Sequence, residues 1–340
     1  MQRRSLLLTA ALTPILAPLL AAPRLARASL PTILSGADTL GPLRAVAIWR
    51  DGDAAGEEIE ARGYHGFTPD RPTNIKSASK SIVSALAGIA IDRGLLQGAD
   101  QPIAPILRDD LPTDPDPRLA RITLGNLLSM QAGLERQSGP NYGRWVSSRN
   151  WVRAALAAPF TQDPGTQMQY STASTHLVSA ILTRVSGQST MELARSWLAG
   201  VEGFAISGWD RDPQGIYLGG NQMAMSTRSL LAFGALYARG GKAGGQQIVS
   251  ERWIAESWEY RTASIFTGQG YGYGWFLDRI GGREVRYGWG YGGQMIYVFP
   301  AARGKAAAAI AMTSDPDQPS ARTGYRNDLH RLAQEIVETL

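Results

Sequence analysis

The sequence of 340 residues contains no cysteine, which excludes disulfide bonds, thiol catalysis and cysteine-ligated metals. Histidine is nearly as scarce, since only His65, His176 and His330 occur and they lie far apart in the chain. Their spacing matches none of the short helical histidine motifs that bind zinc. We therefore expect neither a metal centre nor another cofactor.

Acidic and basic residues nearly balance once the N-terminal segment is set aside. Residues 1–28 hold four arginines and no acid, so the rest of the chain has 30 basic and 29 acidic residues. The net charge of +5 therefore comes mostly from that segment. No basic patch remains to indicate a nucleic-acid partner, and we expect none.

The N-terminal segment has the pattern of an export signal. Arg3-Arg4 precedes an apolar run over residues 6–22, and Ala26-Arg27-Ala28 supplies a small-x-small cleavage site. The paired arginines resemble a twin-arginine signal, and a general secretory signal stays open as the alternative. A membrane anchor is the weaker interpretation, because the apolar segment is short and contains two prolines. We expect a periplasmic or secreted mature chain without stable membrane insertion.

Hydrophobic periodicity predicts helices and strands in a distinctive order. Strands are predicted at 43–50, 57–63, 271–278, 284–287, 294–299 and 306–313, with a turn at 51–53. Helices are predicted at 77–93, 122–130, 150–157, 174–186, 191–198, 226–239, 250–257 and 325–340. A long surface loop is predicted at 136–148.

This order predicts an α/β (α+β) fold, in which helices flank an antiparallel sheet and a mostly helical subdomain is inserted. Residues 29–105 and 241–340 would form the α/β subdomain, and residues 106–240 the helical one. Together they would make one catalytic unit, with the active site in the groove between them.

The segment Ser77-Ala78-Ser79-Lys80 stands where a polar stretch gives way to an apolar helix. A serine and a lysine three residues apart share one face of a helix. Serine is a poor nucleophile until a base takes its proton, and a buried lysine can be that base because desolvation lowers its pKa. Only four lysines occur in the chain, so a lysine at the start of an apolar helix is unexpected unless it has a function. The alternative is a solvated lysine at a helix start, which is what we expect for Lys76.

Two further segments are candidates for the same site. Tyr170 follows a turn and precedes a predicted helix, where it can relay protons if a cation such as Lys80 lowers its pKa. The alternative is a tyrosine half-buried at a subdomain seam. Residues 288–294 are glycine-rich and head a strand, so their backbone can approach a ligand and offer an N–H to an oxyanion. The alternative there is a hairpin turn.

Taken together, these segments resemble the serine β-lactamase-related hydrolases. That group includes class C β-lactamases, D-alanyl-D-alanine carboxypeptidases, family VIII esterases and 6-aminohexanoate-dimer hydrolases. The resemblance covers nearly all of the chain after the export signal and rests on residues 77–84, 122–134, 164–171, 225–234 and 290–300. Residues 313–317 are similar to the 6-aminohexanoate-dimer hydrolase branch. The implied fold is that of β-lactamases and penicillin-binding proteins.

The resemblance also implies a role for each candidate. Ser77 would be the nucleophile, Lys80 its activating partner, and Tyr170 the residue that passes a proton to the leaving group. The backbone N–H groups of Ser77 and Tyr291 would form the oxyanion hole. There are two departures: Thr172 stands where class C enzymes carry the asparagine of Tyr-x-Asn, and the lysine of Lys-Thr-Gly is missing. Both argue against efficient β-lactam hydrolysis.

We therefore predict a serine hydrolase that forms an acyl-enzyme with a small ester or amide. A D-alanyl-D-alanine carboxypeptidase or weak β-lactamase is the first alternative, and a non-catalytic ligand-binding relative is the second. An α/β-hydrolase is disfavoured because the chain has no Gly-x-Ser-x-Gly elbow.

Six residues are candidates for contacts with the small-molecule substrate. Three aromatic residues could form a wall over the groove, although any of them could instead belong to the core: Tyr142, Trp145 and Trp151. Near the expected oxyanion hole, the candidates are Trp289, Gly290 and Gly292.

Overall fold

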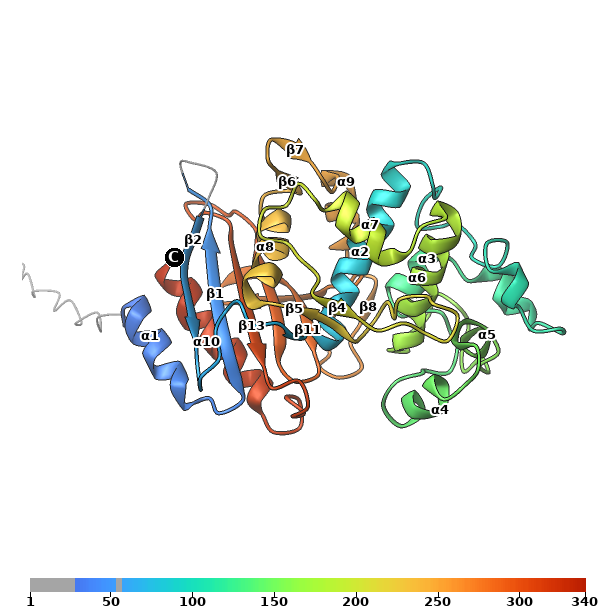
Figure 1. Cartoon of the computed structure of the whole chain (residues 1–340), viewed down its shortest axis with the longest axis horizontal. Coiled ribbons are helices and arrows are strands. Elements are labelled where there is room, and N and C mark those ends of the chain that lie inside the picture. Colours follow the sequence, from blue (N-terminus) through green and yellow to red (C-terminus); the bar gives the residue numbers. More distant parts are fainter. Residues whose placement is uncertain (1–27, 53–56) are drawn as a thin grey trace, which may run out of the picture.

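The computed structural model describes residues 28–52 and 57–340. Its centre is an eight-stranded sheet in which every neighbouring pair is antiparallel, in the order β2-β1-β13-β12-β11-β10-β9-β8. The strands are β1 (Leu43–Arg50), β2 (Glu57–Gly63), β8 (Thr262–Ala263), β9 (Gly270–Tyr271), β10 (Phe276–Ile280), β11 (Arg283–Gly290), β12 (Gln294–Phe299) and β13 (Ala308–Ser314). In Figure 1 the sheet occupies one half of the molecule and a group of helices the other.

Helices cover both faces of this sheet. Along β12, Met295, Tyr297 and Phe299 pack with residues of α10 (Tyr325–Thr339), while Ile296 and Val298 belong to the cluster that includes α8 (Thr227–Ala238). Because successive side chains of a strand point to opposite faces, a strand covered on both faces is apolar throughout. The buried runs of β12 and β13 follow from this arrangement. The short helix α1 (Leu30–Gly36) packs beside α10.

The second half of the molecule is built around the helix α6 (Thr172–Ser186). The helices that pack on it include α2 (Ser79–Asp92), α3 (Leu124–Leu128) and α5 (Trp151–Leu156). Also in or beside this half lie α4 (Tyr142–Val146), α7 (Thr190–Trp197), α9 (Glu251–Ser257) and a small sheet of β3 (Thr73–Asn74), β5 (Met223–Met225) and β4 (Gly208–Trp209). Since α2 also contacts β11, it joins the two halves.

Local sequence explains where several of these helices begin and end. Thr123 and Asn126 form a capping box at the start of α3, and Ser189 and Glu192 form another at α7. Gly187 ends α6 with φ 68°, a left-handed conformation that glycine adopts without steric cost.

The structure corrects the sequence prediction at three places. The predicted strand 271–278 is split into β9 and β10, because Gly274 turns the chain with φ 81°. The predicted loop 136–148 contains the 3-10 turn η5 (Gly139–Asn141) and α4. The helix α8 packs on β1, β12 and β13, although the boundary at residue 240 assigned it to the helical subdomain.

Residues 1–27 of the predicted export signal and residue 53 of the predicted turn lie outside the described residues. Among the residues that are described, none of the helices combines the length and the apolar character needed to cross a membrane.

Close packing between α2 and α9 gives a test of the fold. A Cβ added at Gly88 would lie 2.2 Å from ring carbons of Trp253, which is 2% exposed. Gly88→Ala should therefore lower the free energy of unfolding by about 1–3 kcal/mol, measured by urea denaturation. Gly36→Ala is the control, because its Cβ would meet no atom within 4 Å. Equal stability of the two variants would contradict this packing.

Candidate active site

Ser77 lies in the 3-10 turn η2 (Lys76–Ala78), directly before α2, and Lys80 lies in the first turn of α2. The residue before Ser77 is unusual, because Lys76 has a φ of 50°, which costs free energy for a residue with a side chain. Two contacts hold Lys76 there: its N–H donates to Asn74 Oδ1 at 2.9 Å, and its Nζ lies 3.2 Å from Asp317. The expectation that Lys76 is simply solvated is thus corrected, because it forms an ion pair.

Lys80 is 2% exposed and has neutral hydrogen-bond partners. Its Nζ lies 2.9 Å from Ser77 Oγ and donates to the Gly220 carbonyl oxygen at 2.6 Å. Burial lowers the pKa of Lys80 to about 7. Because removing an ammonium from water without a counter-charge is costly, a large part of Lys80 is a neutral amine near pH 7. Lys80 can then take the proton of Ser77.

Tyr170 is 9% exposed and lies beside the same amine. Lys80 Nζ is 5.1 Å from the centroid of its ring, so the lysine faces the aromatic ring. Burial raises the pKa of Tyr170 to about 12, against the opposing effect of its hydrogen bond with Ser77. The pKa of Tyr170 is thus raised, and the lowering by Lys80 that the sequence analysis set as a condition for its role does not occur. Tyr170 keeps its proton near neutral pH, which suits a proton donor or relay and not a base.

The segment after Tyr170 is fixed by hydrogen bonds to residues 137 and 138. The Gln137 N–H donates to Ser171 Oγ at 3.0 Å, and the Thr172 N–H donates to Ser138 Oγ at 2.8 Å. The Thr172 hydroxyl also lies 3.0 Å from Ser138 Oγ. Thr172 is 5% exposed, so the residue that replaces the class C asparagine is occupied in holding this loop.

The end of β11 lies against the residues just before the η2 turn that holds Ser77. A Cβ on Gly290 would lie 2.3 Å from the carbonyl oxygen of Ile75, and a Cβ on Gly292 would lie 2.1 Å from that of Asp315. These glycines therefore allow backbone to meet backbone, and their role in substrate binding stays a prediction. Ser320 donates to the Tyr291 carbonyl oxygen from both N–H and Oγ, at 3.0 and 2.8 Å, and so fixes this peptide. The oxyanion hole at Ser77 and Tyr291 stays a prediction.

Two of the three residues of the predicted aromatic wall line a pocket. Tyr142 and Trp151 line a pocket of about 510 Å³ together with Val146, Asp210, Arg211, Leu218 and Gln222. Trp145 is 2% exposed and belongs to the core, which corrects its prediction as a substrate contact. Ser77 is not among the lining residues. Gln222 connects the pocket to the segment just before Ser77, because its Oε1 accepts from Asn74 Nδ2 at 2.7 Å.

Trp289 and Phe266 form an aromatic surface next to Tyr170. The Phe266 ring centroid lies 5.3 Å from that of Tyr170 and 6.4 Å from that of Trp289. Trp289 is itself held, since its Nε1 donates to Ser320 Oγ at 3.1 Å and the Arg326 guanidinium stacks on its ring. Phe266 is 47% exposed. Sequence reasoning missed Phe266, because an aromatic residue in a short loop carries no motif.

Sequence reasoning also missed Gly220. Its contact with Lys80 is made by a backbone carbonyl, which any residue type can supply. The one available signal was the Gly219-Gly220 pair, which permits close approach. A Cβ on Gly219 would lie 2.3 Å from the Thr175 carbonyl oxygen, and one on Gly220 would lie 3.0 Å from Lys80 Nζ.

Comparison with known proteins agrees with this geometry. Residues 42–333 match the family model described as Beta-lactamase. The chain belongs to the beta-lactamase family. This is a family of serine hydrolases, and the antiparallel sheet with flanking helices is its fold. The family assignment made from the sequence is thereby confirmed.

Individual relatives of this beta-lactamase family protein have diverse descriptions. A probable fimbrial assembly protein FimD, serogroup H1, from Dichelobacter nodosus is 29% identical over 162 residues, covering 45% of this chain and 40% of that protein. A 6-aminohexanoate-dimer hydrolase from Paenarthrobacter ureafaciens is 26% identical over 221 residues, covering 58% of this chain and 54% of that protein. The chain thus spans about half the length, or less, of these relatives.

Among solved structures, a D-amino acid amidase from Ochrobactrum anthropi SV3 has the same fold. Its TM-score is 0.67 at 17% identity, with 91% of this chain and 99% of that chain covered.

The lowered pKa of Lys80 predicts how the reactivity of Ser77 depends on pH. The neutral amine is the active form and accumulates above the pKa, so phosphonylation of Ser77 by a fluorophosphonate should accelerate with rising pH and level off above about 7. The rate constant is measured by intact-mass spectrometry from pH 5 to 10, with Lys80→Met as the control that should react very slowly. A rate that keeps rising to pH 10 would contradict a buried, neutral Lys80.

Proposed function

We propose that this protein hydrolyses a small ester or linear amide through an acyl-enzyme at Ser77. The observation that carries the proposal is the position of Lys80, whose Nζ contacts both Ser77 Oγ and the Gly220 carbonyl oxygen. A neutral amine that donates to Gly220 turns its lone pair toward the Ser77 hydroxyl. Such a pair generates an alkoxide nucleophile at neutral pH.

In the proposed reaction, Lys80 takes the Ser77 proton while Oγ attacks the substrate carbonyl carbon. The N–H groups of Ser77 and Tyr291 receive the developing oxyanion. When the tetrahedral intermediate collapses, Tyr170 gives its proton to the leaving alcohol or amine and regains one from the Lys80 ammonium. Water then attacks the acyl-enzyme while its proton passes to the neutral Lys80 amine, with Tyr170 as a relay. Lys80 returns that proton to Ser77 Oγ as the ester bond breaks, which releases the acid and restores Ser77.

The surroundings of the site favour substrates without a carboxylate that must be anchored on the strand. Trp289 lies on β11, in the stretch that lacks the Lys-Thr-Gly lysine. The nearby Arg326 donates to the Tyr287 hydroxyl and to Gln269 Oε1, both at 2.6 Å, so its guanidinium is already engaged. The curated relative described as a 6-aminohexanoate-dimer hydrolase supports a linear amide as one substrate class to test. The N-terminal pattern leads us to propose that this activity is exported.

Removing the Ser77 hydroxyl tests the proposal. Ser77→Ala should reduce p-nitrophenyl acetate turnover by at least about 10³-fold, because no other group can form the acyl-enzyme. The control is Ser79→Ala in the same motif, since Ser79 is fully buried and its Oγ has no hydrogen-bond partner within the described chain. Ser79→Ala should keep most of the activity. Undiminished turnover by folded Ser77→Ala protein would show that Ser77 is not the nucleophile.

Phe266 predicts a preference for apolar leaving groups, because it touches the ring of the residue that would protonate them. Phe266→Ala should lower the ratio of kcat/KM for 1-naphthyl acetate over ethyl acetate about tenfold, which corresponds to about 1.4 kcal/mol of lost aromatic contact. Ile265→Ala is the matched control, since Ile265 is 49% exposed and next in the chain. An unchanged ratio in Phe266→Ala, or the same loss in Ile265→Ala, would rule out this wall.

A further inference from the structure

The carbonyl that binds Lys80 belongs to a segment without regular structure. Residues 210–222, named here the Gly220 loop, connect β4 to β5 and bring Gly220 to Lys80. The Gly220 carbonyl oxygen must stay within hydrogen-bond distance of Nζ if it is to orient the lysine. Inside the loop, Arg211 and Tyr217 form an isolated antiparallel bridge, but where the loop lies on the rest of the fold depends on contacts with the elements beside it.

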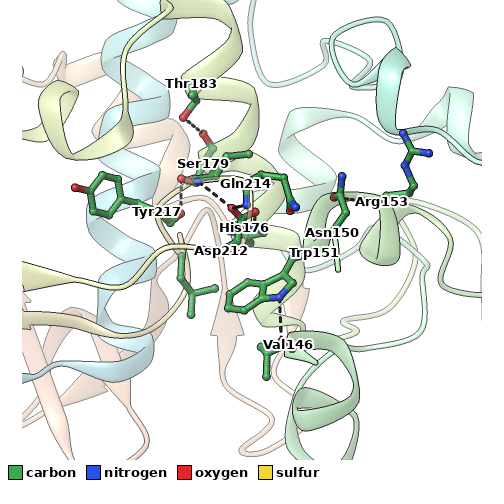
Figure 2. Close-up of polar contacts among 12 residues, drawn as sticks. Val146, Asn150, Trp151, Arg153, His176, Ser179, Thr183, Asp212, Gln214 and Tyr217 are labelled. Carbon is green, nitrogen blue, oxygen red and sulfur yellow. Dashed lines mark hydrogen bonds and ion pairs between the residues drawn. The ribbon is translucent and has the colours of Figure 1, made fainter. Parts of the chain in front are cut away.

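A buried histidine and aspartate supply such a contact. His176 lies on α6 and Asp212 lies in the Gly220 loop, and both side chains are fully buried. The distance from His176 Nε2 to Asp212 Oδ2 is 3.0 Å, and Nε2 is the donor because a carboxylate only accepts. Asp212 Oδ1 accepts from the N–H groups of Gln214 and Ile216 at 2.8 and 2.9 Å. Asp212 therefore folds its own loop and ties it to α6 (Figure 2).

The same face of α6 holds the loop again closer to Gly220. Ser179 Oγ, less than one turn after His176, donates to the Tyr217 carbonyl oxygen at 2.7 Å. Next along the loop, Gly219 lies so close to α6 that a Cβ would come within 2.3 Å of the Thr175 carbonyl oxygen. The path from Asp212 to Gly220 thus runs along α6 and is held by two side chains of that helix. Trp209 also holds it, since its Nε1 donates to the Leu218 carbonyl oxygen at 2.7 Å.

The His176 ring is held in place by packing. Its centroid lies 5.6 Å from that of Trp145 and 5.7 Å from that of Trp151, with interplanar angles of 66° and 63°. His176 Nδ1 is buried and, within residues 28–52 and 57–340, has no hydrogen-bond partner. Among the described residues, Asp212 is therefore the one hydrogen-bond partner of the His176 ring, and His176 is not part of a proton path. Its contribution is the placement of the loop.

We propose that His176 and Asp212 are positioning residues for Lys80. They fix the Gly220 loop on α6, and the loop in turn places the carbonyl that directs the Lys80 amine toward Ser77. This inference rests on the proposed function, because its effect on rate assumes that Lys80 activates Ser77. Neither residue touches Ser77 or Lys80 in the proposed arrangement.

The test compares three substitutions on α6. His176→Leu removes the donor to Asp212 and should lower kcat for p-nitrophenyl acetate by about 100-fold with little change in KM, since a displacement of about 1 Å at the reacting groups has that effect. His176→Gln keeps an N–H donor in reach of Asp212 and should recover most of kcat. Arg184→Leu is the matched control, because it breaks the contact of α6 with Asp110, far along the helix from the Gly220 loop. It should leave kcat unchanged.

A second readout does not depend on catalysis. Amide hydrogen exchange of the peptide covering residues 212–218 should be faster in His176→Leu than in the wild type or in Arg184→Leu, because the Gln214 and Ile216 amides lose a fixed acceptor. If His176→Leu does not fold, Ser179→Ala replaces it, with the same direction expected in exchange and a smaller loss of kcat.

Three results would overturn the inference: wild-type kcat in folded His176→Leu, no recovery in His176→Gln, or an equal loss of kcat in Arg184→Leu. A wild-type protein that shows no Ser77-dependent turnover would instead refute the proposed function, and hydrogen exchange alone would then decide whether His176 anchors the loop.

Discussion

The structure of the site depends on one buried amine. Lys80 is enclosed with only neutral hydrogen-bond partners, so its charged form is disfavoured and its pKa falls to about 7. A carboxylate in contact with Nζ would reverse this effect by stabilising the ammonium. The site provides a serine hydroxyl, a backbone carbonyl and the face of a tyrosine ring instead. Each of these partners comes from a different part of the chain, and each must be held in place by the fold.

The two halves of the molecule supply different parts of the site. The sheet half brings the end of β11 against the residue before the η2 turn, where Gly290 permits contact with the backbone of Ile75. The helical half brings Tyr170 at the start of α6 and Gly220 from the loop that lies along that helix. Because α2 packs on both halves, Ser77 and Lys80 stand at their junction. A change in how the two halves pack would therefore alter the surroundings of Lys80.

Much of this arrangement could be predicted from the sequence, because it is local or periodic. The pairing of Ser77 with Lys80 follows from their separation by three residues near a helix start, and the alternating apolar residues predict the strands. Tyr170 was found from its place between a turn and a predicted helix, and the family resemblance supplied its specific role. The direction of its pKa shift was not, since burial by distant residues is invisible in a local pattern. Gly220 was missed because a backbone carbonyl has no residue-type signature, and Trp145 was misplaced because core and surface aromatics look alike in sequence.

The most direct test of the central claim is a titration of Lys80 itself by NMR, with ¹³C-labelled lysine. Only four lysines occur in the chain, and Lys80→Met identifies the relevant resonance by its loss. We predict that this resonance titrates with a midpoint near the lowered pKa of about 7. A midpoint near about 10.4, the ordinary value for lysine, would contradict the account, because Lys80 would then be an ammonium at neutral pH and unable to activate Ser77.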